Sequence, residues 1–321
     1  MMKRSLLSTW KHLLMEPVYP NVGIEINSDC IRLATVTPRK GRVHVDHMES
    51  IAIPPDSVQI NPFKPNILEW EPVAAAMKDL WSRNRNRPPK ICLLLQDRTA
   101  LAFQLNLETT PSSEKECLEL IRFKLKKNIP FRIEDAQIGY FIDSGAHDFH
   151  SANLWVTVMN PQVLQQYEEL IQATLGTECG LVDLATFNLM NLAHAEIHSQ
   201  GWANEDHLYV NLNRNYISLA ITQKEKLMFF RSRELDRQNG IIDEALAEIH
   251  PTILFYLDKL GGQQFARAFL YAEESPEELA RSLEQAHNVK AVLLNPVSTI
   301  RESKLFAPLL GLLMSRKVEF L

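Results

Sequence analysis

The strongest constraint on the fold of this 321-residue chain is an order of elements that occurs twice. Three strands joined by tight turns are expected in 21–53, and three more in 208–231. Each set is followed by helices that alternate with single strands. Strand triplets followed by α/β units, present twice, predict a duplicated α/β architecture with two lobes, for which the chain is long enough.

The alternating parts are predicted from hydrophobic periodicity. After the first triplet we expect helices at 68–83, 113–127, 161–175 and 186–198, and strands at 91–96, 99–107, 136–143, 154–159 and 181–183. After the second triplet we expect helices at 239–260, 276–285 and 306–314, and strands at 268–271 and 290–294. The strand at 99–107 is expected to continue the sheet that contains 91–96.

Charge and cysteine content exclude several classes of protein. Lys and Arg total 34 and Asp and Glu total 39, so no excess of basic charge is present to neutralise the phosphates of a nucleic acid. The four cysteines lie far apart, without the short spacing of a zinc site or a redox pair. No apolar run approaches the roughly 20 residues that span a bilayer. These features predict a protein of a reducing cytosol.

The first 20 residues form a separate segment. Apolar residues recur there at helical spacing, and most of the charged residues lie off that stripe. The apolar residues are Leu6, Leu7, Trp10, Leu13 and Leu14. We expect a short amphipathic helix in 1–20, which either docks on the protein itself or lies on a membrane surface.

The turns of the two leading hairpins suggest a phosphate site. The first turn contains Asn27, Ser28 and Asp29, and the second lies around Asn213. A tight hairpin turn points backbone N–H groups at a phosphate, and a carboxylate near the turn holds Mg²⁺ or a water of its shell. Two such turns at matching positions of two lobes predict a site for the phosphates of ATP between the lobes.

Several stretches of the sequence, in this order, resemble one family. They are 22–33, 121–131, the strand at 137–142, Leu181-Val182-Asp183 with Phe187, the hairpin 209–221, and 307–312. The helix that ends in Ile129-Pro130-Phe131 is the most specific of them. Over about residues 21–315 the sequence resembles the PilM proteins of type IV pilus assembly, in the actin-like ATPase superfamily. It is also similar to the cytoplasmic part of the GspL-type secretion proteins.

The resemblance implies a two-lobed actin-like, ribonuclease H-like duplication. Lobe 1 is expected to span 21–200 and to carry a small inserted α+β subdomain at about 108–155. Lobe 2 is expected to span 201–300, and a C-terminal helix in 301–321 to return to lobe 1. A subdomain that the family carries in lobe 2 is reduced here to a short polar link at 231–239.

The residues at the implied nucleotide site depart from the family. Each leading hairpin of the family has an Asp and a Gly, where this chain has Glu25 with Asn27, and Asn211 with Asn213. The family's adenine-side loop is rich in glycine, whereas 272–276 has none and carries two carboxylates that would repel a triphosphate. The implied, degenerate nucleotide-binding residues are Glu25, Asn27, Ser28, Asn211, Asn213 and Arg214. We expect no cofactor, and the alternative is a working actin-like ATPase that binds Mg-ATP between the lobes.

Other catalytic machinery is not evident in the sequence. Asp183, where a strand meets a helix, is expected to cap the helix at 186–198. His194 and His198 are spaced i, i+4, which can place two metal ligands on one helix face, but Glu196 lies on another face and no third ligand is evident. We therefore expect two exposed histidines there, with no catalytic residue and no metal ion.

The resemblance implies a protein partner. The family binds the N-terminal peptide of a PilN-like, single-span inner-membrane protein in a groove of lobe 1. The inserted subdomain is expected to help form this groove, although each of its apolar residues can equally belong to its own core. These residues are Phe123, Ile129, Pro130, Phe131 and Tyr140.

The remaining expectations concern the place of the protein in the cell. The resemblance implies a cytoplasmic platform, peripheral to the inner membrane, with self-association and direct membrane contact as further options. Lys124, Lys126 and Lys127 add local positive charge, which either is solvated or faces an acidic partner or lipid. No nucleic-acid partner is expected.

Overall fold

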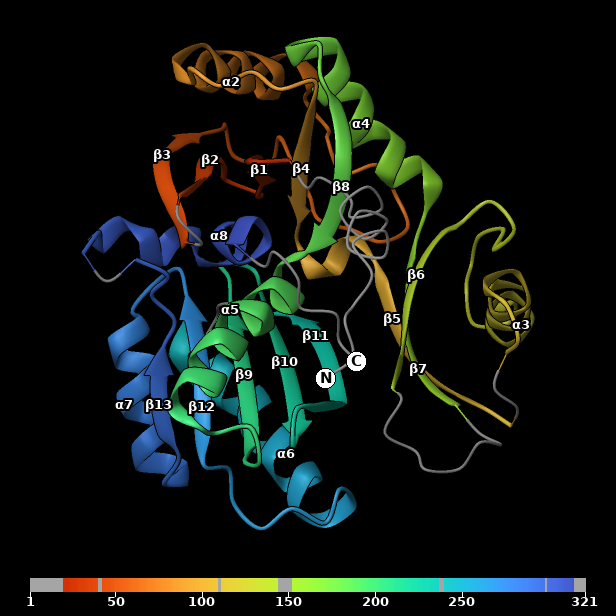
Figure 1. Ribbon diagram of the computed structural model, residues 1–321, viewed down its shortest axis with the longest axis vertical. Coiled ribbons are helices and arrows are strands. Elements are labelled where there is room, and N and C mark those ends of the chain that lie inside the picture. The colour runs from red at the N-terminus through yellow and green to blue at the C-terminus, as the bar shows by residue number, and fades with distance from the viewer. Residues whose placement is uncertain are drawn as a thin grey trace, which may run out of the picture.

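The computed structural model describes residues 20–39, 42–108, 111–143, 152–236, 240–297 and 299–314. It contains two five-stranded sheets, one in each lobe (Figure 1). In order across the first sheet, the strands are β3 (Arg42–Ala52), β2 (Cys30–Arg39), β1 (Val22–Ile26), β4 (Lys90–Leu95) and β8 (Glu178–Leu184). Across the second they are β11 (Lys226–Glu234), β10 (Tyr216–Gln223), β9 (Asp206–Leu212), β12 (Arg267–Ala272) and β13 (Lys290–Leu293). The two orders correspond strand for strand, which confirms the predicted duplicated α/β architecture.

Each sheet combines two kinds of strand pairing. The first three strands of each lobe pair antiparallel and are joined by short turns. The other two strands of each sheet pair in parallel, which requires a crossover through a helix. β1 is buried along its whole length, and β4 is buried except at Lys90. A strand covered on both faces must be almost wholly apolar, so Glu25 in β1 is the exception that draws attention to this strand.

Helices cover both faces of each sheet. α2 (Trp70–Arg83) and α4 (Pro161–Leu175) pack on the outer face of the first sheet, where they form one apolar core with it. α6 (Ile241–Lys259) and α7 (Pro276–His287) do the same on the second sheet. Each lobe is therefore a layered α/β unit in which the sheet lies at the centre.

The remaining two helices exchange lobes. α5 (Ala185–Gln200) follows the last strand of the first sheet but packs on the inner face of the second. α8 (Ala307–Met314) follows the last strand of the second sheet but packs on β1, β2 and β4 of the first. The two helices contact each other where the lobes meet. A Cβ atom added to Gly311 of α8 would lie 2.1 Å from the backbone oxygen of Asn188 in α5, so this approach requires glycine.

A third sheet forms a small subdomain, on the right in Figure 1. Its strand order is β5 (Leu101–Leu107), β7 (Ala152–Met159), β6 (Gln137–Asp143), and α3 (Glu114–Leu125) packs on it. The range predicted for the insertion, about 108–155, leaves out β5 and ends inside β7. The prediction that 99–107 continues the first sheet is wrong. A single 3-10 turn at Asp97–Thr99 redirects the chain after β4. The next strand, β5, therefore pairs with β7 of the third sheet.

The ends of the sequence lie partly outside the described residues. The amphipathic helix predicted in 1–20 falls there except for its last residue, as do residues 315–321. Within 301–321, the structure describes a 3-10 helix at Arg301–Phe306 followed by α8. Among the described residues, no helix combines the length and the hydrophobicity that a membrane span requires.

We predict that Gly311→Ala lowers the free energy of unfolding by about 1–3 kcal/mol, because the added methyl group would overlap the Asn188 carbonyl and force α5 and α8 apart. On an unhindered helix the same change is stabilising by about 1 kcal/mol, since alanine is the better helix former. The midpoint of urea unfolding, measured for the unaltered chain and for Gly311→Ala, shows whether the substitution lowers or raises the free energy of unfolding. An equal or higher midpoint for the variant would show that the contact does not constrain the helices.

Candidate functional site

The turns of the two leading hairpins meet between the lobes. Asn215, in the β9–β10 turn, places its Nδ2 at 3.5 Å from Oγ of Ser28 in the β1–β2 turn. Asn27 of the same β1–β2 turn donates from Nδ2 to Oε1 of Glu273, over 3.4 Å. Glu273 directly follows β12 of lobe 2. The structure thus brings together the two turns that the sequence predicts to face each other.

Two further contacts join the lobes at the same interface. Arg214 forms ion pairs with Asp29 across the lobes, at 3.1 Å, and with Glu274 of its own lobe, at 3.2 Å. Gln96, just after β4, accepts a hydrogen bond from the hydroxyl of Tyr216 in β10. Arg214 therefore binds carboxylates of both lobes.

Arg32 is the central side chain of the interface. The antiparallel register of β1 and β2 places it directly opposite Glu25, and its Nη1 lies 3.3 Å from Oε2 of that residue. Nη1 also donates to the Tyr271 hydroxyl over 3.3 Å, and Nη2 donates to Oε1 of Glu273 over 2.7 Å. The side chains of Arg32, Glu25 and Glu273 are only 6%, 1% and 9% exposed. One cation therefore pairs with a carboxylate from each lobe, away from water.

Burial and neighbouring charges act in opposite directions on this group. Burial raises the pKa of Glu25, and the Arg32 guanidinium opposes the shift. Burial alone would lower the pKa of Arg32, but Tyr271 and the two carboxylates outweigh it and raise this pKa above its usual value. Gln96 also donates from Nε2 to Oε1 of Glu25 over 3.1 Å. Each oxygen of Glu25 thus has a protein donor, Oε2 from Arg32 and Oε1 from Gln96.

Asp97 organises a second buried cluster at the same interface. Its Oδ1 accepts a hydrogen bond from the backbone N–H of Thr186 over 2.9 Å, and its Oδ2 accepts one from the Thr186 hydroxyl over 2.5 Å. Asn211 donates to the same Oδ2 over 3.0 Å, and Asn213 donates to Oδ1 of Asn211 over 2.7 Å. Burial raises the pKa of Asp97, although the hydrogen bonds from Thr186 act to lower it. The cluster joins the start of α5 to the leading hairpin of lobe 2.

The prediction that Asp183 caps α5 is wrong. Asp183 lies inside β8, and its Oδ1 accepts a hydrogen bond from the N–H of Leu184, the residue before the helix. Asp97 instead contacts the first turn of α5, through Thr186. Since Asp97 and Thr186 are 89 residues apart, local sequence gives no sign of this arrangement.

All six residues predicted for a nucleotide site lie at this interface, and each contacts another protein group. They are Glu25, Asn27, Ser28, Asn211, Asn213 and Arg214. Sequence reasoning missed Arg32, Gln96, Asp97 and Tyr271. Arg32 did carry a signal, because it is a charged residue in a buried, mostly apolar strand, opposite another charged residue.

The five residues predicted to contact a partner differ in exposure. Ile129 is 7% exposed and belongs to the core of the subdomain, and Phe131 and Tyr140 are half-buried against that core. Phe123 is 80% exposed, since the buried side of α3 is formed by other positions, and Pro130 is exposed as well. Phe123 and Pro130 are therefore the most exposed of the five, and Ile129 packs inside the subdomain.

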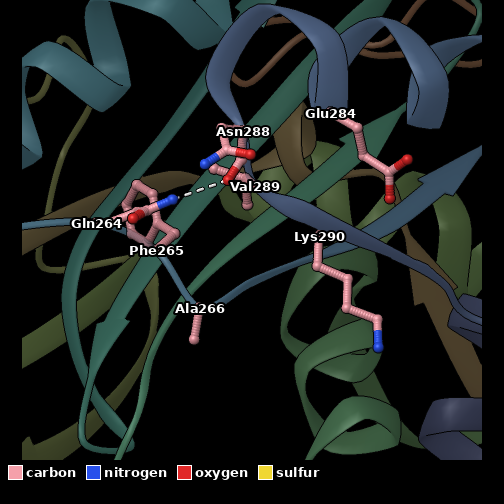
Figure 2. A pocket seen from close by; sticks show the side chains of 7 residues that line it. All are labelled: Gln264, Phe265, Ala266, Glu284, Asn288, Val289 and Lys290. Carbon is pink, nitrogen blue, oxygen red and sulfur yellow. Dashed lines mark hydrogen bonds between the residues drawn. The ribbon is translucent and has the colours of Figure 1, made fainter.

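A hollow on lobe 2 lies away from both sites (Figure 2). It measures about 560 Å³ and is lined by Gln264, Phe265, Ala266, Glu284, Asn288, Val289 and Lys290. Figure 2 shows Nε2 of Gln264 donating to the backbone oxygen of Asn288, over 2.8 Å. These residues gather where β12 and β13 begin, whereas Tyr271 and Glu273 lie at the other end of β12. The hollow is thus separate from the interlobe interface.

Known proteins resemble this chain in structure. No family model and no curated protein matches the sequence. A chain of a PilM-PilN type IV pilus biogenesis complex aligns with a TM-score of 0.75 at 17% identity, covering 94% of this chain and 100% of that one. A Bacteroides thetaiotaomicron protein with actin-like ATPase fold and unknown function aligns with a TM-score of 0.53 at 12% identity, covering 91% and 94%. These likenesses confirm the predicted two-lobed actin-like fold.

A more distant likeness involves a secretion protein. The cytoplasmic domain of EpsL, an inner-membrane component of the Vibrio cholerae type II secretion system, aligns with a TM-score of 0.47 at 10% identity. The alignment covers 90% of this chain and 94% of that one.

We predict that Arg32→Met lowers the free energy of unfolding by about 3–5 kcal/mol, because Glu25 and Glu273 would stay buried without their cation. A double-mutant cycle with Glu273→Gln should give a coupling of roughly 1 kcal/mol or more, since the two side chains touch.

The control for this prediction is Arg39→Met. Arg39 is 62% exposed and pairs with Asp46, so its loss should change stability by at most about 1 kcal/mol. Equal effects of the two substitutions on urea unfolding would show that the buried pair has no special role.

Proposed function

We propose that this chain is a platform protein of a type IV pilus or related secretion machinery. It binds the cytoplasmic N-terminal peptide of a PilN-like inner-membrane protein and does not turn over ATP. The observation that supports this most is the likeness in fold to a chain of a PilM-PilN complex, over 94% of this chain and all of that one. Such a platform works on the cytoplasmic side of the inner membrane, where its partner holds it.

The proposed peptide contact is centred on Phe123. It is the most exposed large apolar side chain among the described residues, and exposed aromatic side chains commonly anchor a partner. Lys124 and Lys127 beside it are exposed, while Lys126 is paired with Glu134 at 3.3 Å. An apolar anchor among positive charges is complementary to a peptide that carries an apolar residue next to acidic ones.

The charges of the interlobe interface support the absence of ATP turnover. Four carboxylates of that interface pair with two guanidinium groups, and a fifth carboxyl group, that of Asp97, lies in the neighbouring buried cluster. The carboxyl groups belong to Glu25, Asp29, Asp97, Glu273 and Glu274, and the guanidinium groups to Arg32 and Arg214. A triphosphate would meet repulsion from the carboxylates and would have to displace existing ion pairs.

The alternative function is a working actin-like ATPase. It is favoured by the convergence of all six predicted residues at one interface. It is also favoured by Oδ1 of Asn27, which is buried without a hydrogen-bond partner among the described groups. For a nucleotide to enter, the contact between Arg32 and Glu273 has to open.

We predict that millimolar MgATP leaves the melting temperature of the protein unchanged, because the interlobe side chains already bind one another. A ligand at about 100 times its dissociation constant stabilises a protein by roughly 2.7 kcal/mol, which amounts to a rise of a few degrees at this size. MgCl₂ alone is the control, and an ATP-binding protein of actin-like fold run in parallel shows that the assay responds. A rise with MgATP would show that the interface still holds nucleotide, and a phosphate-release assay would then decide between the ATPase and a platform that binds ATP without turnover.

We predict that Phe123→Ala weakens binding of the partner peptide at least tenfold, since truncation of an aromatic anchor removes about 2 kcal/mol of binding free energy. The measurement is fluorescence anisotropy of a labelled peptide, the cytoplasmic N-terminal segment of the PilN-like protein of the same genome. Because Phe123 is 80% exposed, the variant should keep its melting temperature.

Phe63→Ala is the matched control for the peptide experiment. Phe63 is an exposed phenylalanine of lobe 1, at 45%, outside the subdomain. Equally tight binding by the unaltered chain, Phe123→Ala and Phe63→Ala would show that the peptide binds elsewhere. No binding by the unaltered chain would contradict the proposed partner.

A further inference from the structure

The histidine pair that the sequence leaves without a third ligand gains one in the structure. His194 and His198 lie one turn apart on α5, with ring centroids 4.1 Å apart. Glu225 approaches them from the turn between β10 and β11 of lobe 2. Its Oε1 lies 3.1 Å from Nδ1 of His194 and 2.7 Å from Nε2 of His198. Two imidazole nitrogens and one carboxylate oxygen therefore converge from two elements that are separate in the sequence.

The backbone of the turn holds Glu225 in this position. β10 and β11 pair as far as Gln223 with Lys226, so the turn consists of Lys224 and Glu225 alone. Both have positive φ, 50° and 69°, a conformation that two-residue hairpin turns usually give to Asn or Gly. Residues with a longer side chain keep such a conformation only where the surrounding structure fixes it. The carboxylate is thus presented to α5 by a tight, defined turn.

The oxygen between the two rings lacks a conventional partner. Oε1 of Glu225 is shielded from solvent and, among the described groups, receives no hydrogen bond of suitable geometry. Its near neighbours are the two imidazole nitrogens. A buried carboxylate oxygen normally has a donor or a cation beside it. A cation bound by all three groups would satisfy it.

We propose that His194, His198 and Glu225 bind one divalent transition-metal ion, with Zn²⁺ as the preferred metal. Zinc takes imidazole nitrogen at 2.0–2.1 Å and carboxylate oxygen at 2.0–2.2 Å, which places tetrahedral ligands roughly 3.3 Å apart. The three candidate ligand atoms lie within 4.8 Å of one another, so small side-chain rotations produce this geometry. Mg²⁺ and Ca²⁺ prefer sites in which all ligands are oxygen atoms. Two of the three ligand atoms here are imidazole nitrogens, which disfavours both ions.

The site leaves one coordination position to water. Three protein ligands with an open fourth position form a common zinc arrangement, and His198 is 51% exposed, so solvent reaches this side. The bound ion would fasten α5, the helix that leaves lobe 1, to a hairpin of lobe 2. This inference does not depend on the proposed platform function.

The test is metal binding by the untagged full chain after treatment with EDTA. Zn²⁺ is titrated in competition with a chromogenic chelator, and Co²⁺ is added separately, because a tetrahedral Co²⁺ site absorbs strongly in the visible range. We expect one equivalent of Zn²⁺ per chain, no competition by millimolar Mg²⁺, and a tetrahedral Co²⁺ spectrum. His194→Ala, His198→Ala and Glu225→Gln should each weaken Zn²⁺ binding at least tenfold.

The matched control is His250→Ala. His250 and His287 also lie side by side, with ring centroids 5.3 Å apart on α6 and α7, so this variant removes one member of another histidine pair. Its Zn²⁺ affinity should equal that of the unaltered chain. Glu225→Gln keeps the size of the side chain, and a melting curve without metal shows that each variant is folded. The proposal is overturned if the unaltered chain takes no Zn²⁺ from the chelator, if the control loses as much affinity, or if Glu225→Gln binds unchanged.

Discussion

The close crossing of α5 and α8 is the constraint on which the arrangement of the two lobes depends. Each helix follows the last strand of one sheet and covers the inner face of the other, so the two must pass each other where the lobes meet. Gly311 against the backbone of Asn188 lets them lie closer than two ordinary side chains would permit. The distance between the two sheets follows from this contact, and so does the distance between the two leading hairpin turns.

At that distance the protein joins the turns with its own charged groups. Arg32 links Glu25 of lobe 1 to Glu273 of lobe 2, with all three side chains almost entirely buried. A buried ion pair adds little net stability compared with apolar packing, but breaking it leaves an unpaired charge in a medium of low dielectric constant. Such a pair therefore selects one relative position of the lobes and makes other positions unfavourable. In this protein the Arg32 side chain bridges the two lobes, a role that a bound ligand could otherwise fill.

The sequence predicts most of the fold, because buried strands such as β1 and β4 are mostly apolar and most helices have an apolar stripe. It fails at 99–107, since an alternating pattern identifies a strand but does not say which sheet the strand joins. At the interlobe site, Glu25 and Asn211 could be located because they belong to recognisable hairpins. Asp97 and Glu225 could not, because each meets its partners from a segment far away in the sequence. Contacts of this kind are set by tertiary structure and leave no local pattern.

The return of α8 to the first sheet also has a consequence for synthesis on the ribosome. The face of β1, β2 and β4 that α8 covers is made early, yet α8 is translated only after the whole of lobe 2. Until residues 307–314 emerge, this apolar face has no cover from its native partner. The first lobe therefore cannot complete its core ahead of the second, although domains usually fold in the order of their synthesis. While lobe 2 is being translated, the exposed apolar face of the first sheet must therefore be protected from aggregation, either by the nascent chain itself or by a chaperone.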